Sequence, residues 1–133
     1  MTEGTTEQGS QLAYYEFMGY DPDELLRRYA VYADRFGGSG AVLDIGCGRD
    51  EFLTLLSDRG VRGVGIDADP NMVSYNTQAG RNVVHAEAVS YLAEHRDEFD
   101  GIFASHVIEH MPATTVENLV HSAAGALRPP VLA

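Results

Sequence analysis

The chain has 133 residues, of which 44% are hydrophobic and 22% charged, and this balance is typical of one soluble globular domain. Its 9 basic and 20 acidic residues give a formal net charge of −11, which disfavours a nucleic-acid partner because like charges repel. No apolar run approaches the length of a membrane span, and the first residues lack the pattern of a signal peptide. Cys47 is the only cysteine and cannot form an internal disulfide, so we expect a cytoplasmic protein.

The segment before the first predicted strand contains a tail and two predicted helices. Residues 1–10 are polar and are expected to form a flexible tail, and residues 11–40 hold helices over Gln11–Met18 and Asp21–Phe36. Asp21 is suited to cap the second helix, whose first position would be Pro22. Its apolar and aromatic residues recur at helical spacing, and we interpret them as core: Leu25, Tyr29, Tyr32 and Phe36.

The stretch Ala41–Phe52 reads A-V-L-D-I-G-C-G-R-D-E-F and predicts a strand, a tight glycine turn and a helix. This order is typical of a nucleotide-like ligand site, because glycine permits a sharp turn and the helix directs free N–H groups at the ligand. An ordinary turn that happens to contain Gly46 and Gly48 is the alternative. A dinucleotide site would need a third glycine where Glu51 stands, and a carboxylate there would face the pyrophosphate. The stretch therefore favours a nucleotide-like ligand without a phosphate chain.

After this stretch, predicted strands and helices alternate. The further predicted strands are Gly63–Asp67, Asn82–His85 and Asp100–Ala104. The further predicted helices are one that Asp69 and Pro70 open, one over Val89–Arg96 and one over Thr114–Leu127. Such alternation predicts an α/β fold with a parallel sheet and helices on both of its faces.

Carboxylates follow the second and third predicted strands. Asp67 stands 19 residues after Gly48 at the carboxyl end of its strand, where an acidic residue can accept hydrogen bonds from both hydroxyls of an adenosine ribose. A helix-capping role for Asp67 is less favoured, because Asp69 already fills it. Glu87 and Ala88 could bind an adenine edge, although Glu87 could equally be a surface residue at the start of a helix.

Taken together, these segments resemble the class I S-adenosylmethionine-dependent methyltransferases over about Ala41–Pro130. The matching motifs are V-L-D-I-G-C-G, G-V-G-I-D, H-A-E-A, F-D-G-I-F-A-S-H-V-I-E-H-M and L-R-P-P. The resemblance implies a Rossmann-like sheet of order 3-2-1-4 within a cofactor-binding domain at 41–133. The family continues through further strands, so the chain reads as truncated after the fourth strand and its helix.

The resemblance also implies site residues and a cofactor, S-adenosylmethionine, with S-adenosylhomocysteine as product. Asp44, Gly46, Cys47 and Gly48 would line the methionine part, and Asp67 would hold the ribose. Ala68, Glu87 and Ala88 would contact the adenine. Ser105 and His106 would lie near the transferred methyl group, and His106 is the candidate catalytic base. Asp50 departs from the family, which often has glycine there, and adds a carboxylate near that of the cofactor.

A second constellation is His106-Val-Ile-Glu109-His110, which has the spacing of an inverted zinc-protease motif. On a helix the two histidines could bind zinc, and Glu109 could act as the base. A metal-assisted methyltransferase is a related alternative. The motif directly follows a strand, where a loop is expected, so we predict no bound metal.

The predicted activity is methyl transfer to an O, N or C atom of a small-molecule or saccharide acceptor, with no nucleic-acid or membrane partner. A non-catalytic cofactor-binding remnant or interaction module is the alternative from another functional class. The fourth strand would lie at an edge of the sheet, and an uncovered apolar edge favours pairing with another chain. We therefore also expect a homo-oligomer through that edge.

Overall fold

The computed structural model describes residues 21–105, 107 and 111–129. The predicted tail, the predicted helix Gln11–Met18 and the motif residues His106, Glu109 and His110 lie outside this part of the chain. The helices are α2 (Pro22–Arg35), α3 (Glu51–Asp58), α4 (Pro70–Gln78), α5 (Ala88–Glu94) and α6 (Ala113–Ala126). The strands are β1 (Ala41–Ile45), β2 (Arg62–Asp67), β3 (Val83–His85) and β4 (Gly101–Ala104).

The four strands form one parallel sheet in the order β3-β2-β1-β4, which confirms the predicted order. β1 is central, and all five of its residues are buried. A strand buried on both faces reads as a nearly continuous apolar run, which explains its sequence. Asp44 interrupts this apolar run. Burying its carboxylate lowers the free energy of unfolding.

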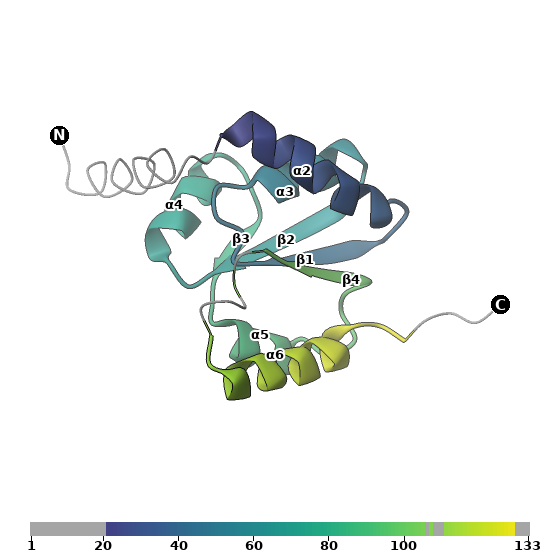
Figure 1. The fold of residues 1–133 in the computed structure, drawn as a ribbon, viewed down its shortest axis with the longest axis vertical. Helices are drawn as coiled ribbons and strands as arrows, with labels where there is room; N and C mark the ends of the chain where they lie inside the picture. The colour runs from purple at the N-terminus through teal and green to yellow at the C-terminus, as the bar shows by residue number, and fades with distance from the viewer. Residues whose placement is uncertain (1–20, 106, 108–110, 130–133) are drawn as a thin grey trace.

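Helices cover both faces of the sheet, as predicted (Figure 1). α2 and α3 pack on one face through an apolar cluster that includes Phe52, Leu53 and Leu56. α5 and α6 pack on the other face through a second cluster that includes Leu92, Leu119 and Phe99. These two cores on either side of β1 fix the sheet, so the loops at the ends of its strands have a rigid base.

Local sequence signals set the starts of α2 and α4. The Asp21 side chain accepts a hydrogen bond from the Asp23 N–H at 3.0 Å, and that of Asp69 accepts from the Asn71 N–H at 2.9 Å. Both are caps of the predicted kind. The helix predicted to reach Arg96 ends at Glu94 instead. There the His95 N–H bonds the Leu92 carbonyl at 3.2 Å, a tighter turn that closes the helix.

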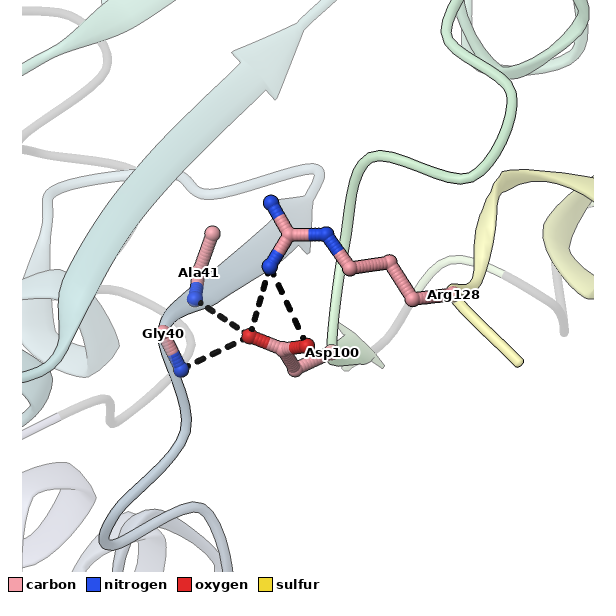
Figure 2. Close-up of polar contacts among 4 residues, drawn as sticks. All are labelled: Gly40, Ala41, Asp100 and Arg128. Carbon is pink, nitrogen blue, oxygen red and sulfur yellow. Dashed lines mark hydrogen bonds and ion pairs between the residues drawn. The ribbon is translucent and has the colours of Figure 1, made fainter. Parts of the chain in front are cut away.

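At the amino edge of the sheet, Asp100 joins three segments (Figure 2). Its carboxylate accepts from the backbone N–H groups of Ala41 at 2.9 Å and Gly40 at 2.7 Å. The Arg128 guanidinium, just after α6, lies 3.1 Å from the same carboxylate. The Ala41 donor and these neighbours lower the pKa of Asp100 from its ordinary value. Because this edge is opposite the glycine turn, Asp100 belongs to the scaffold and not to the candidate site.

Candidate functional site

The candidate site lies at the carboxyl edge of the sheet, where three strands end at one level. Ile45 of β1 pairs in register with Ile66 of β2 and with Ala104 of β4. The residues that follow these three are therefore brought to the same edge: Gly46, Asp67 and Ser105. Ligands bind at this edge in open parallel sheets, so the register alone brings three predicted site residues together.

The glycine turn after β1 has the backbone geometry that the sequence predicts. Gly46 has a φ of 66° and Gly48 a φ of 56°, which residues with a side chain adopt rarely. The N–H groups of Gly46 and Cys47 both point at the Ile66 carbonyl, at 2.8 and 3.2 Å. A side chain at Gly46 would also come within 2.7 Å of Val107 Cγ2. The turn therefore needs glycine for its conformation and for the close approach of the loop after β4.

Cys47 faces the protein core and not the ligand side of the turn. Its side chain belongs to the cluster under α2 and α3, and a Cβ at Gly65 would lie 2.8 Å from its sulfur. Burial, together with the charges of Asp44 and Asp67, raises the pKa of the Cys47 thiol far above its ordinary value. The thiol therefore stays neutral and unreactive, and only the backbone of Cys47 is suited to contact a ligand.

Asp67 is held in place by two backbone donors. One carboxylate oxygen accepts from the Gly48 N–H at 3.1 Å, and the other accepts from the Asp69 N–H at 2.9 Å. Each oxygen keeps a second acceptor position, because a carboxylate offers about four in all. Burial raises the pKa of Asp67 despite these two bonds. The side chain is thus a preformed acceptor for two adjacent hydroxyl groups.

Asp44 and Glu51 add two further carboxylates beside the turn. Asp44 is only 3% exposed. Burial raises its pKa well above the ordinary value, and the charges of Glu51 and Asp67 raise it further. Glu51 lies 3.5 Å from Arg49, and burial raises its pKa too. This concentration of negative charge suits a ligand that carries positive charge.

Two residues that were predicted to contact adenine, Ala68 and Glu87, form hydrogen bonds within the protein. The carbonyl oxygen of Ala68 lies 3.0 Å from the His85 ring nitrogen Nε2. The Glu87 carboxylate accepts from the N–H groups of Val89 at 3.0 Å and Ser90 at 2.8 Å, and the Ser90 bond is the main cause of its lowered pKa. The Glu87 side chain is therefore the N-cap of α5, which supports the structural alternative. Contacts of Glu87 and Ala88 with adenine remain predictions.

Two further residues lie at the site. Tyr29 was interpreted as a core residue, and Asn76 was not predicted. The Tyr29 hydroxyl lies 3.0 Å from Ser105 Oγ, so a residue interpreted as core also has a polar contact at the site. Asn76 of α4 is fully buried, and its amide donates to the carbonyls of Gly48 at 2.6 Å and Met72 at 2.8 Å. No sequence signal pointed to Asn76, because its burial and its long-range contact are seen only in the structure.

Asn76 ties the glycine turn to α4, and its removal should destabilise the protein. Asn76→Leu leaves the Gly48 and Met72 carbonyls without their amide donor, and we expect a loss of about 1–3 kcal/mol in the free energy of unfolding. Urea denaturation measures this loss. Asn82→Leu is the matched control, because Asn82 is exposed. Equal stability of the two variants would show that the turn does not depend on Asn76.

A family model described as a methyltransferase domain matches residues 14–133. The chain belongs to this methyltransferase domain family. A comparison with curated proteins found no match.

Solved structures share the fold of this methyltransferase domain. One is a SAM-dependent methyltransferase from Archaeoglobus fulgidus, with a TM-score of 0.82 and 29% identity over 88% of this chain and 53% of that one. A second concerns conversion of a disulfide bond into a thioacetal group during echinomycin biosynthesis, with a TM-score of 0.66 and 25% identity over 75% and 44%. A magnesium protoporphyrin IX methyltransferase from Synechocystis has a TM-score of 0.64 and 18% identity over 78% and 53%. The chain therefore spans about half the length of these structures.

Asp50 is where the methyltransferase domain departs from its family's first motif. Its φ of 77° is one that glycine adopts freely and other residues rarely, which fits the glycine that the resemblance implies at this position. Its carboxylate lies 3.2 Å from Arg81 Nε, at the start of the segment that leads into β3. The added charge is thus paired within the protein, which limits the repulsion of a cofactor carboxylate that the sequence suggested.

The catalytic and metal hypotheses concern residues that follow β4 in the sequence. His106, Glu109 and His110 lie outside the described residues. Within residues 21–105, 107 and 111–129, no group of three or more His, Cys, Asp or Glu side chains could hold a metal ion. No helix in the same part of the chain is long and apolar enough to cross a membrane.

Proposed function

We propose that this methyltransferase domain binds S-adenosylmethionine and transfers its methyl group to a small-molecule acceptor, leaving S-adenosylhomocysteine. The observation that carries the proposal is the carboxyl edge of the sheet, where the glycine turn and the fixed Asp67 carboxylate meet. The Gly48 N–H donates to the Asp67 carboxylate at 3.1 Å, and this contact between the two predicted features supports the proposal. The similarity to an archaeal SAM-dependent methyltransferase supports the same cofactor.

The residues present fit this cofactor at each of its parts. Asp67 keeps acceptor positions for the two ribose hydroxyls, because each of its oxygens accepts only one backbone bond. The turn at Gly46 and Gly48 lets the backbone approach the ligand closely. Ala68 and Ala88 would flank the adenine. Asp44, which is buried, would offer a carboxylate to the positively charged methionine end.

When bound, the cofactor supplies an electrophilic methyl group on a sulfonium, which an acceptor atom displaces in line. The contribution of the protein is then positioning and the exclusion of water. An alcohol acceptor would also need a base, for which His106 is our candidate. We propose a small molecule or a saccharide as acceptor, since the net charge of −11 disfavours a nucleic acid.

Two further parts of the proposal concern the cellular context. A single cysteine fits a reducing compartment, and we place the protein in the cytoplasm. β4 forms one edge of the described sheet, and Phe103 and Ile102 on it are partly buried. An apolar edge of this kind is suited to pair with another strand, and a homo-oligomer through this edge is the arrangement we propose.

Ligand-dependent thermal stability tests the proposed cofactor. S-Adenosylhomocysteine at about one hundred times its dissociation constant should add about 2.7 kcal/mol to the free energy of unfolding, which raises the melting temperature by several degrees. NAD should give no shift, because Glu51 stands where a dinucleotide site needs glycine. A shift with NAD and none with S-adenosylhomocysteine would overturn the proposal.

A further inference from the structure

Tyr29 connects the N-terminal helix to the end of β4. Its hydroxyl lies 3.0 Å from Ser105 Oγ, across 76 positions of sequence. The ring is fixed by edge-to-face contacts with Phe103 at 5.6 Å and with Phe52 at 6.3 Å between centroids. Phe103 is in β4 and Phe52 in α3, so three elements around the site determine where this hydroxyl lies. Such packing leaves the phenol little freedom to turn away.

We propose that Tyr29 is a positioning residue that donates its phenolic proton to Ser105 Oγ and so directs the Ser105 hydroxyl proton at the methionine end of the cofactor. This inference rests on the proposed function, because it takes Ser105 to contact the cofactor. A phenol is more acidic than an alcohol and is the better donor of the pair, whereas the alcohol is the better acceptor. When Tyr29 donates to one of its two acceptor positions, the Ser105 hydroxyl keeps its single O–H for a bond to another group.

The surroundings of Tyr29 support this direction of the hydrogen bond. Burial raises the pKa of Tyr29, and the nearby charges of Glu51 and Asp44 raise it as well, so the phenol keeps its proton and can donate. Ser105 follows Ala104, which pairs with Ile45 of β1, so the Tyr29–Ser105 pair lies at the same carboxyl edge of the sheet as the glycine turn. A protonated phenol in this position is a donor and is not suited to act as a base.

The hydrogen bond between Tyr29 and Ser105 could instead serve only to anchor α2. A double-mutant cycle distinguishes this structural role from the proposed orientation of the Ser105 hydroxyl. Tyr29→Phe removes the hydroxyl and keeps the aromatic contacts. Ser105→Ala removes the other partner, and it carries the same test if Tyr29→Phe folds poorly. Tyr32→Phe is the matched control, because Tyr32 also packs against Phe103, is 45% exposed and has no hydroxyl partner in the described part of the chain.

The measurements are the dissociation constant for S-adenosylhomocysteine by calorimetry and, separately, the unfolding midpoint in urea without ligand. We expect Tyr29→Phe to weaken binding about 3- to 10-fold, and Ser105→Ala to weaken it at least as much. The double variant should bind no more weakly than Ser105→Ala alone, because both changes remove one shared interaction. Tyr32→Phe should bind as the wild type does.

Two results would overturn the inference while leaving the proposed function intact. One is wild-type affinity in Tyr29→Phe together with a lowered unfolding midpoint, which would make the bond an anchor of α2. The other is a fully additive loss in the double variant, which would show that the two hydroxyls act independently. If the wild-type protein does not bind S-adenosylhomocysteine at all, the proposed function fails, and this inference fails with it.

Discussion

Replacing Asp67 with alanine should weaken binding of S-adenosylhomocysteine by about 2–4 kcal/mol, the range for losing charge-assisted hydrogen bonds to two hydroxyls. The expected loss is large because the carboxylate is already oriented before binding. Its two oxygens accept from the Gly48 and Asp69 N–H groups, so the wild type orders no side chain when the ligand arrives. Titration calorimetry on the wild type and the variant measures the difference directly.

A control must separate this loss from a general effect of charge or stability. Asp58→Ala removes one negative charge from the exposed C-terminal end of α3, away from the turn at its N-terminal end, and should leave affinity unchanged. The free energy of unfolding of Asp67→Ala without ligand shows how much the lost backbone bonds matter for the fold. Unchanged affinity in Asp67→Ala, with the wild type binding well, would refute the ribose assignment.

Replacing Asp44 with asparagine should stabilise the ligand-free protein by about 1–3 kcal/mol at a pH above the folded-state pKa of Asp44, because it removes a charge from a side chain that is only 3% exposed. The same change should weaken cofactor binding, since we propose that this carboxylate contacts the methionine end of the cofactor. A gain in stability with a loss of function is typical of residues that serve a site. Urea denaturation and calorimetry measure the two effects.

The pH dependence of stability gives this prediction a second test. Burial raises the folded-state pKa of Asp44 above its unfolded value, so the folded protein binds protons more readily. Its charge therefore lowers stability above the folded-state pKa, and stability rises as the pH falls through that pKa. The pKa values of Asp50, Glu51 and Asp67 are also raised by burial, which adds to the trend with the same sign.

The wild type should accordingly become more stable as the pH falls from above the folded-state pKa of Asp44 toward the ordinary pKa range of carboxyl groups, and Asp44→Asn should show a smaller rise. Asp100 and Glu87 have lowered pKa values and lose their stabilising effect only at more acidic pH, outside this window. Asp58→Asn, an exposed carboxylate with the same change of charge, is the control and should keep the wild-type slope. An equal slope in Asp44→Asn and the wild type would contradict the buried-charge explanation.

The sequence was sufficient for what depends on short stretches of chain. Apolar runs separated by helical patterns predicted a parallel sheet, because such strands are buried on both faces and need crossover helices. Asp69 before Pro70 predicted a helix start, and the cap forms as expected. Gly46 and Gly48 predicted a turn with positive φ, which both adopt. Each of these features follows from the conformational limits of a few neighbouring residues.

The sequence also placed Asp67 beside the glycine turn, since parallel strands end at one edge of the sheet. It could not establish whether the Glu87 carboxylate caps α5 or remains free, because both uses need the same residue at the same position. The backbone geometry decided this, by placing the N–H groups of Val89 and Ser90 within reach of its oxygens. Whether a side chain bonds nearby backbone groups or stays free for a ligand depends on the three-dimensional arrangement of those groups.

Only the tertiary structure revealed the contacts between distant segments. Tyr29 and Ser105 are 76 positions apart, and Asn76 and Gly48 are 28 apart, so no local pattern links either pair. Helical spacing suggested that Tyr29 packs in the core, and its ring does contact Phe103 and Phe52. Where its hydroxyl points depends on how α2 lies across the end of β4. That arrangement results from the strand order and from the packing of both helical layers on β1, which no single segment encodes.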